Sequence, residues 1–208
     1  MHKFLVFDTE TEDLNLHSTR PWQLSYLLCE GIMIKHKVDK LLHVDDFNIS
    51  RDSARITNFD RDIYEANKVP AKPEVERFMK FYEREDIWIV GHNIINFDLY
   101  TVRNMCRENG VDHDYSKVLP RYIDTNCLAK AIKMDIMPPK DPDEFLIWQM
   151  KLSTYFQKGM KTNLAHMADE YDIQYDKKRL HDALYDIELN WKVFLKMKMD
   201  LKLFHEVA

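Results

Sequence analysis

Short runs rich in apolar residues mark the predicted strands of this chain. The first run, Phe4–Phe7, has four successive apolar residues with β-branched and aromatic members, which is typical of a buried strand. Two further runs, 23–29 and 32–38, flank a turn at Glu30-Gly31, so the first three strands are predicted to form an antiparallel meander. Later strands are predicted at 87–90 and 122–124.

Apolar residues at helical spacing predict helices between and after the later strands. Residues 50–70 are mostly polar and predict a loop with one short helix, and prolines at 138, 139 and 142 predict another loop. The predicted helices cover residues 62–66, 73–84, 97–109, 125–134, 144–156, 163–171 and 181–199. Strands that come first and then alternate with helices predict an α/β fold, in which helices cover a sheet that is antiparallel over strands one to three and parallel thereafter.

Composition limits the class of protein. The 208 residues, 45% of them hydrophobic, fit one domain over 1–208, with an inserted loop or helix expected at about 138–156. A formal net charge of −5 gives no global attraction for nucleic acid, so a local patch or metal would have to hold a polyanion. Cys29, Cys106 and Cys127 are dispersed, which favours reduced thiols in a cytoplasm. We expect no signal peptide and no membrane contact.

Two acidic residues follow the first strand directly. Side chains alternate along an extended chain, so Asp8 and Glu10 are predicted to point to the same face. Their mutual repulsion is costly unless protons or cations offset it, and Mg²⁺ prefers hard oxygen ligands. The pair therefore predicts a divalent-metal site at the end of a core strand. The alternative is that Asp8 caps a turn and Glu10 is solvated.

A second acidic position lies between a strand and a helix. The sequence from Gly91 to Asp98 leaves a core strand and opens a helix, and such junctions are where sheet proteins often build sites. Asp98 is therefore a candidate site residue, and Asn93 lies in the same turn. The alternatives are that Asp98 only complements the helix dipole and that Asn93 only makes the turn.

A third group of polar residues opens the long final helix. His181 and Asp186 are five residues apart, which places them about 140° apart around a helix, so they cannot be neighbours on one helical face. We therefore expect Asp186 on the helix and His181 on the segment that enters it, where a mobile imidazole suits proton transfer. Asp182 and Glu188 are interpreted as solvated helix acids.

The three groups together resemble a known family. Phe-Asp-Thr-Glu-Thr, His-Asn-x-x-x-Phe-Asp and His-x-Ala-x-x-Asp occur in this order from Phe4 to about Asn190, as in the DEDD superfamily of 3′–5′ exonucleases, and the last form is that of the DEDDh branch. Residues 123–129 and 163–165 are also similar to that family. The resemblance implies a ribonuclease H-like fold. It implies four metal ligands, a general base at His181 and two bound Mg²⁺, for which Mn²⁺ could substitute; the ligands are Asp8, Glu10, Asp98 and Asp186.

The function implied by the resemblance is metal-dependent 3′–5′ exonuclease activity. Two cations would serve the attacking and leaving oxygens of a phosphodiester at the 3′ end of single-stranded nucleic acid. DNA is the favoured substrate, in the manner of proofreading, and a DNA polymerase is a candidate partner. Three alternatives stay open: an RNA-trimming exoribonuclease, a nucleic-acid-binding module without turnover, and a structural subunit of a polymerase.

Substrate contacts are expected around these motifs. The resemblance places the loop after Glu10 near the terminal nucleotide, and in that loop Glu12-Asp13 replaces the usual Thr-Gly. The two added charges are expected to weaken the approach of the backbone to a phosphate or to narrow substrate choice. Lys177, Lys178 and Arg179 predict either a basic rim or a solvated turn. The remaining candidate contacts to substrate are Thr11, Leu14, His92, Asn93, Phe97, Tyr115 and His166.

Overall fold

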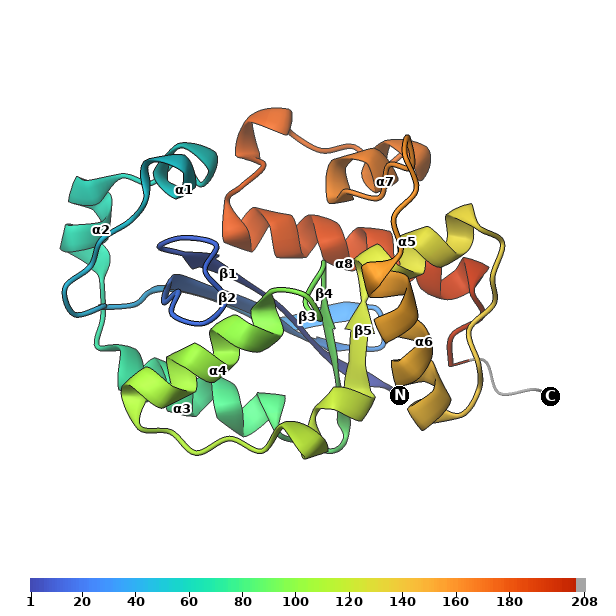
Figure 1. Ribbon diagram of the computed structural model, residues 1–208, viewed down its shortest axis with the longest axis horizontal. Helices are drawn as coiled ribbons and strands as arrows, with labels where there is room; N and C mark the ends of the chain where they lie inside the picture. Colours follow the sequence, from blue (N-terminus) through green and yellow to red (C-terminus); the bar gives the residue numbers. More distant parts are fainter. Residues whose placement is uncertain (205–208) are drawn as a thin grey trace.

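Five strands form one mixed sheet in the computed structural model, which describes residues 1–204 (Figure 1). The strands are β1 (Lys3–Thr11), β2 (Pro21–Glu30), β3 (Met33–Leu41), β4 (Ile87–Gly91) and β5 (Tyr122–Asp124). They lie side by side in the order β3-β2-β1-β4-β5. The first three strands pair antiparallel, whereas β4 pairs parallel with β1 and β5 pairs parallel with β4. The predicted α/β fold with a mixed sheet is therefore confirmed.

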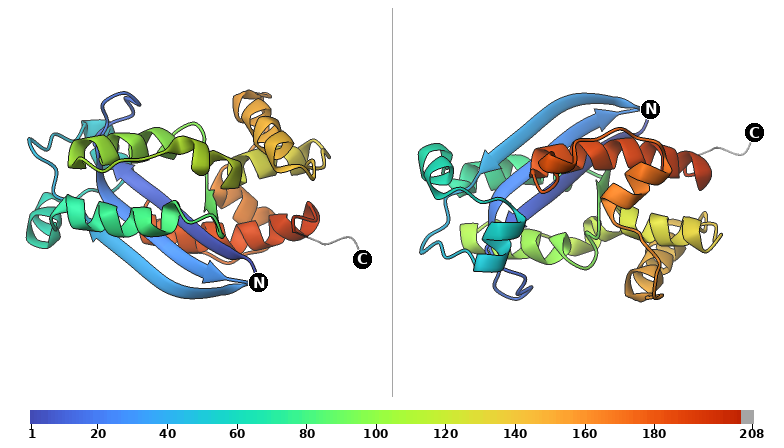
Figure 2. Two further views of the ribbon diagram at one scale, coloured as in Figure 1. Left: turned by 90° about the horizontal axis from the view of Figure 1, so that it is seen from below. Right: turned by 90° about the horizontal axis from the view of Figure 1, so that it is seen from above.

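Helices cover both faces of this sheet (Figure 2). On one face, Phe7 of β1 packs against Phe78 with ring centroids 5.4 Å apart, and on the other face Phe4 lies 5.4 Å from Trp191. The alternation of β1 side chains thus separates a layer with α3 and α4 from a layer with α8. The helices are α1 (Arg51–Ile56), α2 (Arg61–Asn67), α3 (Ala71–Tyr82), α4 (Asp98–Asn109), α5 (Thr125–Lys133), α6 (Pro142–Thr154), α7 (Leu164–Glu170) and α8 (Ala183–Asp200), with 3₁₀ turns η1 (Tyr115–Lys117), η2 (Leu119–Arg121) and η3 (Lys177–Arg179).

The end of β1 extends beyond its parallel neighbour. β1 pairs with β4 only over residues 3–6, whereas its pairing with β2 continues to Thr11. After β4 the chain turns at Gly91, where a Cβ atom would collide with the Ile94 side chain and lie 3.1 Å from the Phe7 carbonyl oxygen. Only glycine permits this close approach. The last residues of β1 are thereby left beside the segment that leads into α4.

Two sequence predictions about helices are wrong. Residues 50–56 were expected to form a loop, but they contain α1, whose cap Ser50 accepts a hydrogen bond from the Ser53 amide at 3.1 Å. Only Ser53 of this helix is buried, so no apolar stripe marks it in the sequence. Pro142 was expected to interrupt the chain, but it is the first residue of α6, where its missing N–H has no helical partner to lose.

The segment around α6 supports the edge of the sheet. Gln149 on α6 is fully buried, and its amide accepts from the Asp124 backbone N–H and donates to the Tyr122 carbonyl, both at 2.8 Å. These bonds complete the hydrogen bonding of the last strand, β5. An insertion at 138–156 relative to the family stays a prediction. Within residues 1–204, no helix is long and apolar enough to cross a membrane.

Candidate active site

A cavity of about 560 Å³ opens at the end of β1, between the start of α4 and the start of α8. It brings together the five residues predicted from the three sequence motifs, and it also includes Asn93 and Phe97. The lining residues are Phe7, Asp8, Thr9, Glu10, His92, Asn93, Phe97, Asp98, Asn163, Leu164, Ala165, Leu180, His181, Asp186, Ile187 and Asn190. Lining residues as far apart in the chain as Phe7 and Asn190 thus share one small volume.

Asp8 and Glu10 are half-buried on the face of β1 that α8 covers. Burial and the charges of Asp98, Glu10 and Asp186 raise the pKa of Asp8 well above its usual range. Burial and the neighbouring acids, Asp186 first among them, raise the pKa of Glu10 to about 8. Each carboxylate therefore loses hydration and faces like charges, and a proton or a cation would relieve both penalties.

Asp98 approaches the same cavity from the opposite side of β1. It is only 2% exposed, and the hydroxyl of Thr9 donates to its carboxylate at 2.7 Å. Thr9 alternates with Asp8 and Glu10 along the strand, so this bond ties the start of α4 to the other face of β1. Burial raises the pKa of Asp98 to about 7, although the Thr9 hydrogen bond opposes the rise. No local pattern in the sequence indicated that Thr9 holds this acid.

Asp124 organises the loop that delivers Asn93 and Asp98. Its carboxylate accepts hydrogen bonds from the backbone N–H groups of Asn93 at 2.9 Å and Ile95 at 3.1 Å, and it also caps α5 by accepting from Asn126. Asn93 has a positive φ of 63°, a conformation that asparagine tolerates better than most residues. The prediction of an N-cap at Asp124 is confirmed, and the same carboxylate also fixes the rim of the cavity.

His92 lies behind this rim in a polar network. Its Nδ1 is 3.0 Å from the Thr125 hydroxyl, which in turn donates to Asn190 Oδ1 at 2.8 Å. Burial lowers the pKa of His92 to about 4, so the ring is neutral at neutral pH. This network links β4, α5 and α8 at the back of the cavity. Asn190, which the motifs did not single out, is therefore a further cavity residue.

His181 occupies the segment before α8, as predicted. It has a positive φ of 70°, and its backbone N–H donates to Asp186 Oδ2 at 3.0 Å. The other carboxylate oxygen of Asp186 is buried without a hydrogen-bond partner, and burial raises the pKa of this residue to about 6. One oxygen of Asp186 thus positions the His181 backbone, while the other is free to bind a ligand.

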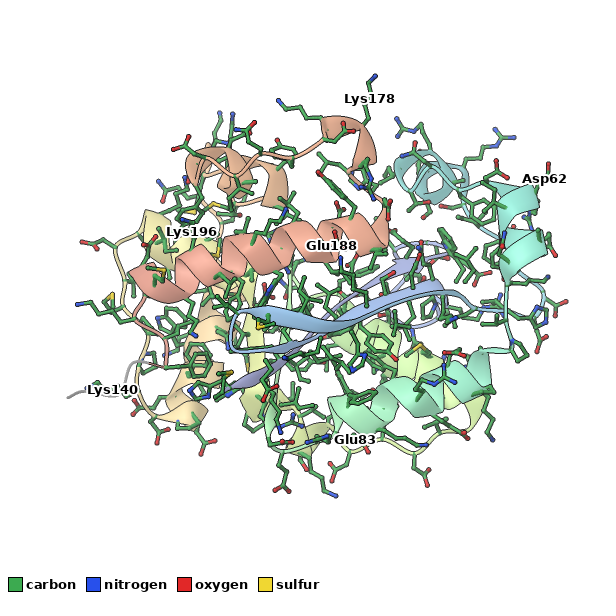
Figure 3. All side chains as sticks on the ribbon, turned by 180° about the vertical axis from the view of Figure 1, so that it is seen from behind. Asp62, Glu83, Lys140, Lys178, Glu188 and Lys196 are labelled. Atoms are coloured by element: carbon green, nitrogen blue, oxygen red, sulfur yellow. The ribbon has the colours of Figure 1, made fainter. Side chains whose placement is uncertain are left out.

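Asp182 and Glu188, interpreted as solvated acids, lie outside the cavity lining. Asp182 has a structural role that this interpretation missed, because it caps α8 by accepting from the Tyr185 amide at 3.2 Å. Glu188 pairs with Lys37 of β3 at 2.6 Å and thereby connects α8 to the edge strand of the sheet (Figure 3). Neither is a simple solvated helix acid.

Other predicted substrate contacts are not part of the cavity lining. Thr11 is buried and donates to the Asp13 carbonyl oxygen, whereas Leu14 is 76% exposed on the neighbouring loop. Residues 177–179 form η3, and Lys178 projects away from the rest of the molecule (Figure 3). His166 pairs with Glu170 at 3.0 Å, and the ring of Tyr115 packs 4.2 Å from that of His113. The structure therefore does not place these predicted contacts in the cavity.

The chemistry of the cavity fits a divalent cation. Four carboxylates supply hard oxygen donors, and Asp186 keeps one oxygen unpartnered. Within residues 1–204, however, no group of three or more His, Cys, Asp or Glu side chains forms a ready-made metal site. The Thr9 hydrogen bond holds Asp98 on its own side, and like charges oppose a closer approach. The four carboxylates thus line one cavity, but their oxygens are not yet close enough together to form a metal site.

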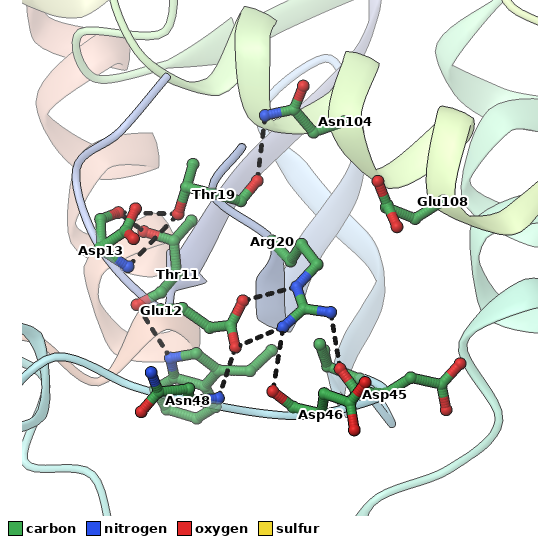
Figure 4. Close-up of polar contacts among 12 residues, drawn as sticks. Thr11, Glu12, Asp13, Thr19, Arg20, Asp45, Asp46, Asn48, Asn104 and Glu108 are labelled. Atoms are coloured by element: carbon green, nitrogen blue, oxygen red, sulfur yellow. Dashed lines mark hydrogen bonds and ion pairs between the residues drawn. The ribbon is translucent and has the colours of Figure 1, made fainter. Parts of the chain in front are cut away.

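Glu12 is neutralised by a clamp that the sequence did not predict (Figure 4). The Arg20 guanidinium donates to both Glu12 oxygens, at 2.7 and 2.9 Å, and the backbone N–H of Asn48 donates to the same carboxylate at 2.7 Å. Arg20 also donates to the Asp45 carbonyl oxygen at 2.6 Å. The expectation that Glu12 presents an extra charge to substrate is therefore wrong, because the carboxylate is buried and paired with an arginine.

Comparison with protein families identifies the chain. The exonuclease family RNase_T matches residues 5–194. The chain belongs to this exonuclease family, within the DEDD superfamily of 3′–5′ exonucleases. The predicted class, a hydrolase of phosphodiester bonds, is thereby confirmed at the level of the family. No curated protein matches the chain.

Solved exonuclease structures share the fold. The zinc-bound complex of E. coli exonuclease I with single-stranded DNA is 17% identical, with a TM-score of 0.76 over 98% of this chain and 42% of that one. The E. coli exonuclease I complexes with dT13 and dA16 are each 18% identical, with TM-scores of 0.73 and 0.75 over 95% and 96% of this chain and 41% of theirs. The chain therefore spans about two-fifths of the length of exonuclease I, and the likeness concerns the fold.

Proposed function

We propose that this member of the exonuclease family removes nucleotides from the 3′ end of single-stranded nucleic acid, with DNA as the favoured substrate. The observation that carries the proposal is the convergence of Asp8, Glu10, Asp98, Asp186 and His181 on one cavity. All four acids have a pKa raised by burial, which favours the binding of cations. We propose two Mg²⁺ as the natural ions, with Mn²⁺ able to replace them.

The acids would divide the task between two cation positions. Asp8 would contribute to both, Glu10 and Asp186 would complete the position on the side of the nucleophile, and Asp98 would act on the side of the leaving group. Divalent cations bound there would lower the pKa of a water molecule and neutralise phosphate charge. Two observations support this division: one Asp186 oxygen has no hydrogen-bond partner, and the charged groups that shift the pKa of Glu10 are all acids.

His181 is proposed as the general base. His181 lines the cavity, and its backbone bond to Asp186 keeps the residue beside the acids. An imidazole in this position can accept a proton from the attacking water. Asn93 and Phe97, which line the same cavity, are proposed to contact the terminal nucleotide, and exposed Leu14 is proposed to reach it from the adjacent loop.

Hydrolysis of 5′-labelled strands tests the proposal. Single-stranded DNA and RNA of the same sequence would be incubated with the protein and Mg²⁺, Mn²⁺ or a chelator. We expect a ladder of products shortened from the 3′ end, faster with DNA, which the chelator abolishes. Release of the labelled 5′ nucleotide first, or turnover that persists in the chelator, would contradict the proposal.

The same assay distinguishes the alternatives. Preference for RNA would indicate an exoribonuclease that trims ends. Binding without turnover would indicate a nucleic-acid-binding module or a structural subunit, which the presence of all five site residues disfavours. A DNA polymerase partner and a cytoplasmic location stay predictions; the three cysteines are buried and unpaired, in keeping with a reducing compartment.

A further inference from the structure

An acid-free stretch leads into the active-site cavity. Between Glu144 and Asp169 the chain has no acidic residue, although 35 of its 208 residues are Asp or Glu. The centre of this stretch carries Lys151, Lys158 and Lys161, none of which is in an ion pair within residues 1–204. Because the whole chain has a net charge of −5, this stretch is a local positive surface on an otherwise acidic protein.

Two aromatic residues lie among these lysines. Phe156 is 86% exposed and Tyr155 is 38% exposed, just after the end of α6. The Phe156 ring contacts no other aromatic ring within the described residues. Exposed rings interleaved with free cations are the combination that binds single strands, since bases stack on the rings and phosphates pair with the cations.

The part of the chain from Ser153 to Leu164 is attached to the rim of the cavity at both ends. At its start, the Ser153 carbonyl oxygen accepts from Asn96 Nδ2 at 3.2 Å, and the same amide donates to Asn93 Oδ1 at 3.1 Å. At its far end, Asn163 and Leu164 line the cavity directly. In Figure 1 the segment runs from the end of α6 past the end of β5 to the start of α7. The stretch is therefore joined to the rim of the cavity at both ends, with residues 154–162 between these two points.

We propose that residues 151–161, the basic segment, bind the single strand upstream of the 3′ end as it leaves the cavity. This inference rests on the proposed exonuclease function and specifies where the rest of its substrate lies. The basic segment is better suited than η3, because Arg179 of η3 already pairs with Asp182 at 3.2 Å, and Asp172 and Asp176 precede η3 closely. The lysines complement phosphate charge, and the exposed rings can stack only on unpaired bases, so the combination selects a single strand as the occupant.

Binding without hydrolysis tests the inference directly. Fluorescence anisotropy of a labelled oligothymidylate of about 12 nucleotides would be measured in chelator. We expect the double variant Lys158→Gln/Lys161→Gln to bind more weakly and to reduce the log–log slope of affinity against salt by about 1.4, since each phosphate contact contributes about 0.7 on a single strand. The matched control is Lys72→Gln/Lys80→Gln, which removes the same charge from exposed positions on α3.

Variants of Phe156 separate stacking from charge. Phe156→Ala is expected to weaken binding by roughly five- to a hundred-fold, with the salt slope unchanged. Phe156→Leu keeps an apolar side chain without a ring and is expected to behave like the alanine variant. All of these side chains are exposed, so the melting temperature should stay at the native value.

Kinetics with two lengths of substrate complete the test. On the long strand the variants should raise KM and leave kcat unchanged, whereas on a dinucleotide, which is too short to reach the basic segment, they should match the native protein. Native affinity and native salt slope in the lysine variants, or an equal loss in the α3 control, would overturn the inference. Loss of turnover on both lengths by the native protein would instead contradict the proposed function, and the anisotropy result would still stand.

Discussion

Glu10 and Glu12 are two residues apart at the end of β1, yet their surroundings are opposite. Burial and the charges of Asp186 and Asp98 raise the pKa of Glu10 to about 8. Glu12 receives two hydrogen bonds from the Arg20 guanidinium and one from the Asn48 backbone N–H. The comparison shows that the same strand end carries one acid whose charge is compensated within the protein and one whose charge a bound cation would compensate.

Removing an acid from the unpaired group should have the largest effect. Asp8→Ala or Asp186→Asn should abolish hydrolysis, because the proposed cation positions lose a ligand. Without added cation, the free energy of unfolding should stay the same or rise by about 1 kcal/mol, since like-charge repulsion is reduced. Nuclease assays and urea denaturation would measure the two effects. Full turnover in either variant would refute the assignment of the acids.

Replacing the imidazole should have the next largest effect. His181→Ala should lower the rate of hydrolysis by roughly 10²–10⁴ because the proposed general base is lost. Binding of single-stranded DNA, measured in chelator, should be largely retained, and His36→Ala, which removes an exposed imidazole of β3 outside the cavity, provides the control. A variant that cleaves at the native rate would show that another group takes the proton.

Removing Glu12 should lower stability. Glu12→Ala leaves the Arg20 guanidinium without its carboxylate and the Asn48 backbone N–H without its acceptor, so we expect the free energy of unfolding to fall by about 2–3 kcal/mol. Asp52→Ala, at an exposed acid of α1, should change it by less than about 0.5 kcal/mol. Equal stability in both variants would show that the clamp is not needed to hold the loop.

The pH dependence of stability follows from the raised pKa values of the cavity acids. In the folded protein the pKa is about 8 for Glu10, 7 for Asp98 and 6 for Asp186, against ordinary values of 4.5 and 3.8. The folded state therefore binds more protons than the unfolded state between about pH 4 and pH 8, so stability falls as pH rises through this window.

Thermal melting at several pH values measures this fall. Without cation we expect the melting temperature to fall between pH 5 and pH 8, and Mg²⁺ should reverse the fall by replacing the protons. In Asp186→Asn the fall should be smaller. Stability that rises over the same range would show that the acids are not held together as described.

Local patterns in the sequence predicted the positions of the strands and the motif residues well. The apolar run Phe4–Phe7 indicated the central strand, and the angular argument placed His181 before the final helix, where the structure has it. Side-chain partners across the fold could not be predicted in this way. Thr9 holds Asp98 from 89 residues away, and nothing in the local sequence distinguishes that threonine from any other strand residue.

The clamp and α6 show the same limit. Glu12 and Arg20 lie at the two ends of a loop, and only the path of the loop brings them together. Gln149 completes the edge of β5 from a helix that the sequence suggested was an insertion. These partners depend on tertiary packing, which neither hydrophobic periodicity nor motif spacing encodes.

The positive φ of His181 brings the stability of the fold and the proposed catalytic role of this residue into conflict. At a φ of 70°, the backbone would be less strained with glycine than with a residue that has a Cβ atom. His181→Gly is therefore expected to raise the melting temperature while it removes the proposed general base, so stability and the proposed chemistry place opposite demands on this one position.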